Sequence, residues 1–79
     1  MRLPVADRPY LRPTPRQREI LAAYLELGTV AKAAAKLGMT VFAARGEMAA
    51  ARKRTGMTTE QMIYAGARDG WITTLEITT

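Results

Sequence analysis

Apolar positions along the chain recur every three or four residues, in segments that glycines separate. The first of these segments contains Ile20, Leu21, Tyr24, Leu25 and Leu27. This spacing places the five side chains on one side of a helix. Thr14 is a typical N-cap for that helix, because Pro15 and Gln17 occupy the first and third helical positions of a capping box. Gly28 is a typical helix end, so the pattern predicts a helix over residues 15–27.

Three further segments repeat the order of a threonine cap, a helical body and a glycine stop. A short helix is expected after Thr29 and up to Lys36, and a longer one over residues 41–55, which are rich in Ala, Arg and Lys. A fourth helix is expected from Thr58 to about Asp69. The pattern therefore predicts an all-α domain, a four-helix bundle.

The two ends of the chain differ from this helical domain. Residues 1–13 hold three of the four prolines, which disfavour helices and central strands, so we expect a flexible arm. The basic residues of the arm are Arg2, Arg8 and Arg12. Such an arm either stays disordered or reaches into a minor groove of DNA. Residues 73–79 are expected to form a short C-terminal tail, β-prone but too short for a sheet, which leaves residues 14–72 as the folded domain.

Composition argues against catalysis and against a metal or cofactor site. The chain has no His and no Cys among its 79 residues, so it lacks the usual general base, the usual thiolate nucleophile and the commonest metal ligands. Its seven acidic residues form no close pair. We therefore expect a protein that is not an enzyme. It also lacks an apolar run long enough to span a membrane and a secretory signal, which predicts a cytoplasmic protein.

The positive charge is concentrated in the middle of the sequence. The net charge is +5, and residues 29–57 alone carry six Lys and Arg against the single Glu47. Residues 58–79 are net negative, with three acidic residues against Arg68. A basic stripe on a small domain is typical of a protein that binds a polyanion. The alternative interpretation is ordinary solvated surface charge.

The segment from Gly28 to Thr40 has the pattern of a helix-turn-helix. Two helices that cross steeply need a small residue at the crossing, which Ala33 or Ala34 supplies. The turn needs a residue that tolerates positive φ, and Gly38 fits that position. Thr40 then caps the second helix and would lie near a phosphate. An ordinary αα-hairpin uses the same kind of turn, but the charge favours a DNA-binding unit.

Three motifs, in this order, resemble the LuxR/GerE-type helix-turn-helix domain. They are Thr14-Pro-Arg-Gln-Arg-Glu-Ile-Leu21, Ala34-x-x-Leu-Gly-Met-Thr40, and Gly56-Met57 followed by Ala67-Arg-Asp-Gly-Trp-Ile72. The resemblance implies a compact four-helix bundle whose third helix enters the major groove and whose fourth helix forms a symmetric dimer. The pattern is more weakly similar to LysR-type winged helices and to region four of bacterial sigma factors.

The chain departs from the LuxR/GerE pattern on the third helix and near the start of the first. Ala43 and Ala44 stand where the family has a small polar residue and Val, and Glu47 stands where a buried His is common. Gln17 replaces an acidic residue. Gly46 lies in the middle of the third helix, at a cost of about 1 kcal/mol relative to Ala. Either the backbone approaches DNA closely there or the helix is loosened.

Helical spacing divides residues 41–55 into two faces. The face expected to pack against the bundle contains Ala44, Met48, Ala51 and Thr55. The candidate DNA-binding residues are Thr40, Val41, Phe42, Arg45, Gly46, Ala49, Arg52, Lys53 and Arg54, with Lys32 and Arg16 from the preceding helices. Arg45 is the candidate guanine reader, and Val41 or Phe42 suits a thymine methyl group, unless Phe42 belongs to the core. Arg52, Lys53 and Arg54 are expected to meet phosphates.

These expectations combine into a sequence-specific, double-stranded-DNA-binding transcriptional regulator. The fourth helix is expected to form a homodimer through Met62, Ile63, Gly66 and Trp71. The alternative is an adaptor that contacts RNA polymerase, a sigma factor or another regulator through that helix and the tail. The chain has no room for a sensing domain, so regulation would act through abundance or a partner. A regulator encoded by a phage or mobile element fits this description.

Overall fold

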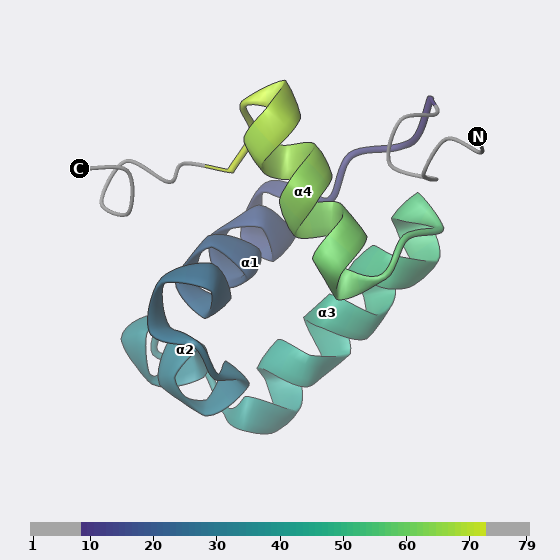
Figure 1. The fold of residues 1–79 in the computed structure, drawn as a ribbon. Coiled ribbons are helices and arrows are strands. Elements are labelled where there is room, and N and C mark those ends of the chain that lie inside the picture. Colours follow the sequence, from purple (N-terminus) through teal and green to yellow (C-terminus); the bar gives the residue numbers. More distant parts are fainter. Residues whose placement is uncertain (1–8, 73–79) are drawn as a thin grey trace.

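The computed structural model describes residues 9–72 and consists of four helices joined by short turns (Figure 1). They are α1 (Pro15–Leu27), α2 (Val30–Lys36), α3 (Val41–Thr55) and α4 (Thr59–Asp69). The predicted all-α class and the predicted helices are confirmed, and residues 9–72 contain no strand. The predicted β-prone tail, and Arg2 and Arg8 of the arm, lie outside the described residues.

Each helix begins at a threonine that caps it. The hydroxyls of Thr14, Thr29, Thr40 and Thr58 each accept a hydrogen bond from the backbone N–H three residues later. Gln17 and Gln61 complete reciprocal capping boxes at the starts of α1 and α4. Replacement of such a cap by Ala typically costs about 0.5–2 kcal/mol, so these contacts fix where each helix starts.

The core is small and relies on alanine. Ile20, Leu21 and Met62 are the largest fully buried side chains, and Ala34 and Ala44 fill the space between α2 and α3. Alanine adds little volume, so the helices approach closely. Figure 1 shows α4 lying across α1 and beside the C-terminal end of α3, which closes the open side of the bundle.

Helix α4 contributes Met62 and Gly66 to this core, although the sequence predicts both as dimer contacts. Met62 is 0% exposed, and Gly66 is buried under the residues that follow the helix. A Cβ atom on Gly66 would lie 2.5 Å from Ile72 Cγ1 and 2.9 Å from Trp71 Cζ3. The prediction that Met62 and Gly66 face a second copy is therefore wrong, because a chain this short needs both to close its own core. Ile63 and Trp71 are partly exposed.

Where the structure describes it, the arm is hydrogen-bonded to the end of the domain. The Tyr10 hydroxyl donates a hydrogen bond to Asp69 Oδ2 at 2.5 Å and accepts one from Trp71 Nε1 at 2.9 Å. These three side chains tie the residues before α1 to the end of α4. Tyr10, which the sequence assigns to the arm, thus lies against the folded domain, because two polar groups near the C-terminal end of the domain bond its hydroxyl.

Acid titration of Asp69 should loosen this anchor. The hydrogen bonds from Arg68 and then from Tyr10 hold the pKa of Asp69 at about 2, below its ordinary value of 3.8. The folded state favours the carboxylate, so its stabilising contribution is complete above about pH 4 and is lost as the pH falls toward 2. We expect Asp69→Asn to flatten the pH dependence of the unfolding free energy in that window, as measured by urea denaturation.

Glu60→Gln is the matched control for this change. Glu60 is exposed and has no hydrogen-bond or ion-pair partner within residues 9–72. An Asp69→Asn variant whose stability falls with acid as steeply as that of the control would contradict the proposed anchor.

Candidate nucleic-acid interface

Helices α2 and α3 are joined by a four-residue turn, as a helix-turn-helix requires. Gly38 occupies the turn with a φ of 69°, a conformation that side chains disfavour. The Met39 N–H donates to the Ala34 carbonyl at 2.8 Å, which closes the turn against the end of α2. Ala34 and Ala44 are both buried where the two helices meet. The turn therefore sets the direction of α3 through backbone hydrogen bonds and close packing.

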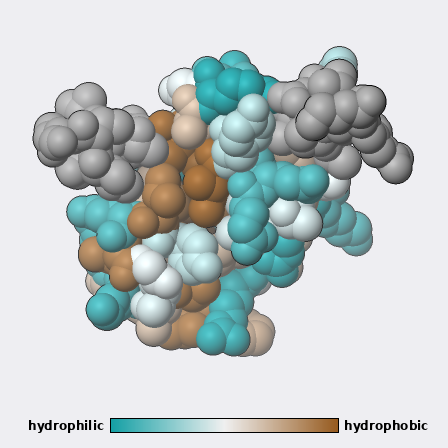
Figure 2. Space-filling model, in the orientation of Figure 1, coloured by the Kyte–Doolittle hydropathy of each residue, from teal (hydrophilic) through white to brown (hydrophobic). Residues whose placement is uncertain are grey.

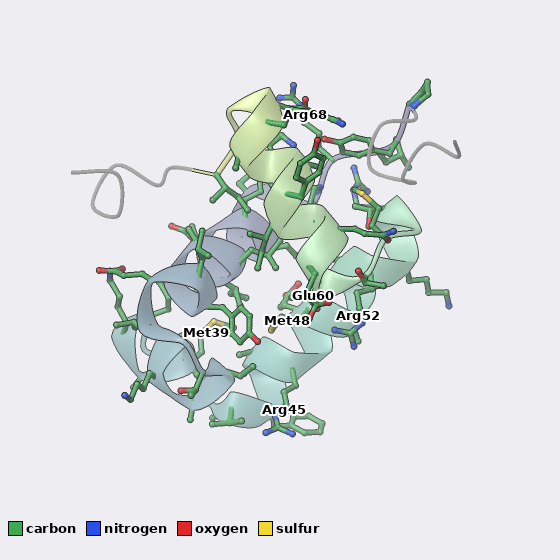
Figure 3. All side chains as sticks on the ribbon, viewed as in Figure 1. Met39, Arg45, Met48, Arg52, Glu60 and Arg68 are labelled. Carbon is green, nitrogen blue, oxygen red and sulfur yellow. The ribbon has the colours of Figure 1, made fainter. Side chains whose placement is uncertain are left out.

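Helix α3 has one buried face and one exposed face, as its sequence predicts. Its buried residues are Ala44, Met48, Ala51 and Thr55. Its exposed residues include Val41, Phe42, Arg45, Gly46, Ala49 and Arg52. Figure 3 shows Met48 directed toward the centre of the bundle and Arg45 directed away from it. The exposed face is the larger and more basic of the two, which makes it the candidate surface for a polyanion.

Phe42 lies on this exposed face and takes no part in the core. Its side chain is 89% exposed, and that of its neighbour Val41 is 36% exposed. Ala44, two residues later, points into the bundle, and two residues correspond to about 200° around a helix. The core interpretation of Phe42 is therefore wrong.

The basic side chains of this region fall into two groups. Within residues 9–72, Lys32, Arg45 and Lys53 are exposed and have no hydrogen-bond or ion-pair partner. Arg52 instead donates to the Thr59 hydroxyl at 3.3 Å, and Arg54 Nε donates to the Arg12 carbonyl at 2.6 Å. The first group is available to a ligand without breaking any contact.

Arg16 belongs to the second group. Its guanidinium pairs with Glu19 at 3.1 Å and donates to the Leu37 carbonyl at 3.4 Å. It remains exposed, and its bond to Leu37 links α1 to the turn before α3. Arg16 therefore holds the turn of the helix-turn-helix against α1 and also adds positive charge.

Gly46 lies where nothing in the fold requires a glycine. A Cβ atom there would meet no heavy atom within 4 Å, and α3 continues through this position without interruption. Helix α3 is therefore continuous through Gly46. Gly46 and exposed Ala49 leave part of the exposed face of α3 without a long side chain.

A shallow depression of about 340 Å³ borders α3 on the side of α4. It is lined by Tyr24, Val30, Arg45, Met48, Arg52, Thr59 and Glu60. Figure 3 shows Arg52 and Glu60 close together where α3 and α4 meet. Sequence reasoning did not identify Thr59 and Glu60 as neighbours of this surface. The only signal was the cap at Thr58, which places both residues in the first turn of α4.

Two positions at which the chain departs from the LuxR/GerE pattern contact each other. Gln17 is buried, and its Nε2 donates to Glu47 Oε1 at 3.3 Å. The Gln17 Oε1 atom accepts the Thr14 N–H at 2.9 Å. The Gln17 amide therefore caps α1 and holds α3 against it.

The described residues hold neither a candidate metal cluster nor a helix that could span a membrane. Within residues 9–72, no three acidic side chains converge on a point that could hold a metal ion. None of the helices in that range is both long and apolar enough to cross a membrane. No protein-family model, curated protein or solved structure matches the chain.

Proposed function

We propose that this protein binds double-stranded DNA sequence-specifically, with α3 in the major groove, and regulates transcription. The observation that carries the proposal is the exposed face of α3. Phe42, Arg45, Ala49 and Arg52 follow one another at helical spacing, and all four are exposed. An α-helix fits the major groove, where arginine can form two hydrogen bonds with guanine.

Charge along α3 supports the same orientation. Arg52 and Lys53 lie two turns beyond Arg45, near the C-terminal end of the helix, where they suit phosphates at the groove edge. Lys32 adds an exposed cation from α2. Of the two acidic residues of α4, Glu60 borders the depression beside Arg45 and Arg52, and Asp69 lies at the opposite end of the helix.

Titration of a labelled duplex of random sequence with the whole chain at about 50 mM salt tests this proposal. We expect saturable binding, and a pool of random duplexes should then yield an enriched sequence. The absence of binding to any duplex would favour an adaptor that contacts RNA polymerase or a sigma factor through α4. One observation supports that second candidate: Tyr64 is 52% exposed on α4, with Arg68 5.5 Å from the centre of its ring.

We further propose that two copies bind together on a two-fold symmetric DNA site. With Met62 and Gly66 buried, the expected dimer residues that remain partly exposed are Ile63 and Trp71. Figure 2 shows hydrophobic side chains gathered where α4 crosses α1. We expect the measured mass to correspond to two chains on a selected site, and Ile63→Glu to reduce it to one. A single wild-type chain on an asymmetric site would contradict the dimer.

A further inference from the structure

Phe42 is the single phenylalanine of the chain, and the fold makes no use of it. It is 89% exposed in the first turn of α3, immediately after the Thr40 cap has fixed the start of the helix. Its side chain has no donor or acceptor, so it cannot recognise a phosphate. A large exposed apolar group in this position suits an apolar partner on whatever surface α3 meets.

Arg45 fixes where that partner lies. It follows Phe42 by three residues, which places the two side chains on one side of the helix, about 4.5 Å apart along its axis. Successive base pairs are about 3.4 Å apart. If Arg45 reads a guanine, Phe42 therefore lies over an adjacent base pair or the next one.

Small residues beside this pair allow close contact. Gly46 and Ala49 are both exposed on the same side of α3 as this pair, and a Cβ atom on Gly46 would meet no heavy atom within 4 Å. The flanking charge is positive, from Arg45, Arg52 and Lys53. An apolar side chain surrounded by cations on a low surface is complementary to the floor of the major groove, where the apolar group on offer is a methyl group.

We propose that Phe42 recognises the C5-methyl group of a pyrimidine that neighbours the guanine bound by Arg45. This inference rests on the proposed DNA-binding function and deepens it by naming part of the preferred sequence. Thymine carries that methyl group, and 5-methylcytosine carries the same group on a different base pair. The site therefore senses a methyl group, and both bases present it.

Removal of single methyl groups from the DNA tests this assignment directly. Each thymine of the selected duplex is replaced in turn by deoxyuridine, which removes only the methyl group. Loss of one buried methyl corresponds to about a fourfold loss of affinity. We expect this loss at one thymine for each α3 helix in the complex. That thymine should lie in the base pair adjacent to the guanine that Arg45 reads, or in the base pair after that. At that position, a 5-methylcytosine–guanine pair should bind about fourfold more tightly than a cytosine–guanine pair.

Phe42→Ala is the protein variant that complements the DNA substitutions. The side chain is exposed, so we expect the variant to keep the helical circular dichroism and thermal midpoint of the wild type. It should bind the thymine and deoxyuridine duplexes equally, whereas Tyr64→Ala, which removes an exposed aromatic group from α4, should keep the difference.

Three results would overturn the inference. Wild-type binding that is insensitive to every deoxyuridine would remove methyl recognition and leave the proposed function intact. Sensitivity that persists in Phe42→Ala would assign the methyl contact to another residue. No binding of wild type to any duplex would overturn the inference together with the proposed function, and would point to Phe42 as a contact for another protein.

Discussion

Affinity for duplex DNA is expected to fall several hundredfold when the salt concentration rises from about 50 to about 200 mM. The exposed cations Lys32, Arg45, Arg52 and Lys53 lie on or beside the proposed DNA-binding face. With Arg54 and Arg16 they offer about four to six phosphate contacts for each copy, and each contact releases condensed counterions. The logarithm of the association constant should therefore fall against the logarithm of salt with a slope of about −4 to −5 for one protomer.

Fluorescence anisotropy at several salt concentrations measures this slope. Lys53→Ala should make the slope less steep by about 1, because Lys53 has no partner within residues 9–72 and its loss removes one phosphate contact. Phe42→Ala, which changes no charge, should leave the slope unaltered. A slope near zero, with or without these changes, would contradict DNA binding through the basic face.

Arg45→Ala is expected to reduce binding to the preferred sequence by about 1–3 kcal/mol and to leave non-specific binding nearly unchanged apart from one charge. Arg45 is exposed near the start of α3, and its side chain makes no hydrogen bond or ion pair within the described residues. A bidentate contact with guanine O6 and N7 is lost when the guanidinium is removed, and no other side chain is placed to restore it.

Arg52→Ala is the matched control, because it removes the same group two turns later on the same helix. Two turns correspond to about 10.5 Å, so Arg52 lies toward the groove edge and should weaken binding to all sequences alike. Arg52 also donates to Thr59, so the unfolding free energy of both variants should be measured alongside. Selected sequences that are identical for the wild type and Arg45→Ala would show that α3 is oriented differently in the groove.

Local sequence determined the helices, because their ends depend on contacts between residues that are close along the chain. Thr14 and Gln17 bond each other three residues apart, and Gly38 needs only its own φ to make the turn. The two faces of α3 follow from the same local geometry, since helical spacing alone places Phe42 and Ala44 on opposite sides of the helix. This is why the candidate DNA-binding face could be predicted residue by residue.

Contacts between distant residues were decided by the tertiary structure alone. Tyr10 meets Asp69 and Trp71 about sixty residues away, so nothing in the local pattern of the arm indicates that it is anchored. Gln17 and Glu47 each look like a departure from a family pattern until they are seen to share a hydrogen bond.

Helix α4 shows the division most clearly. Its sequence determined that it would be amphipathic, with small and apolar residues on one side. Whether Met62 and Gly66 faced a partner or the interior depended on how much core the other three helices could supply. Because those helices meet largely through alanine, they leave a space that Met62 fills, and Ile72 and Trp71 close over Gly66. Periodicity defines the apolar face of a helix, but only packing decides what covers it.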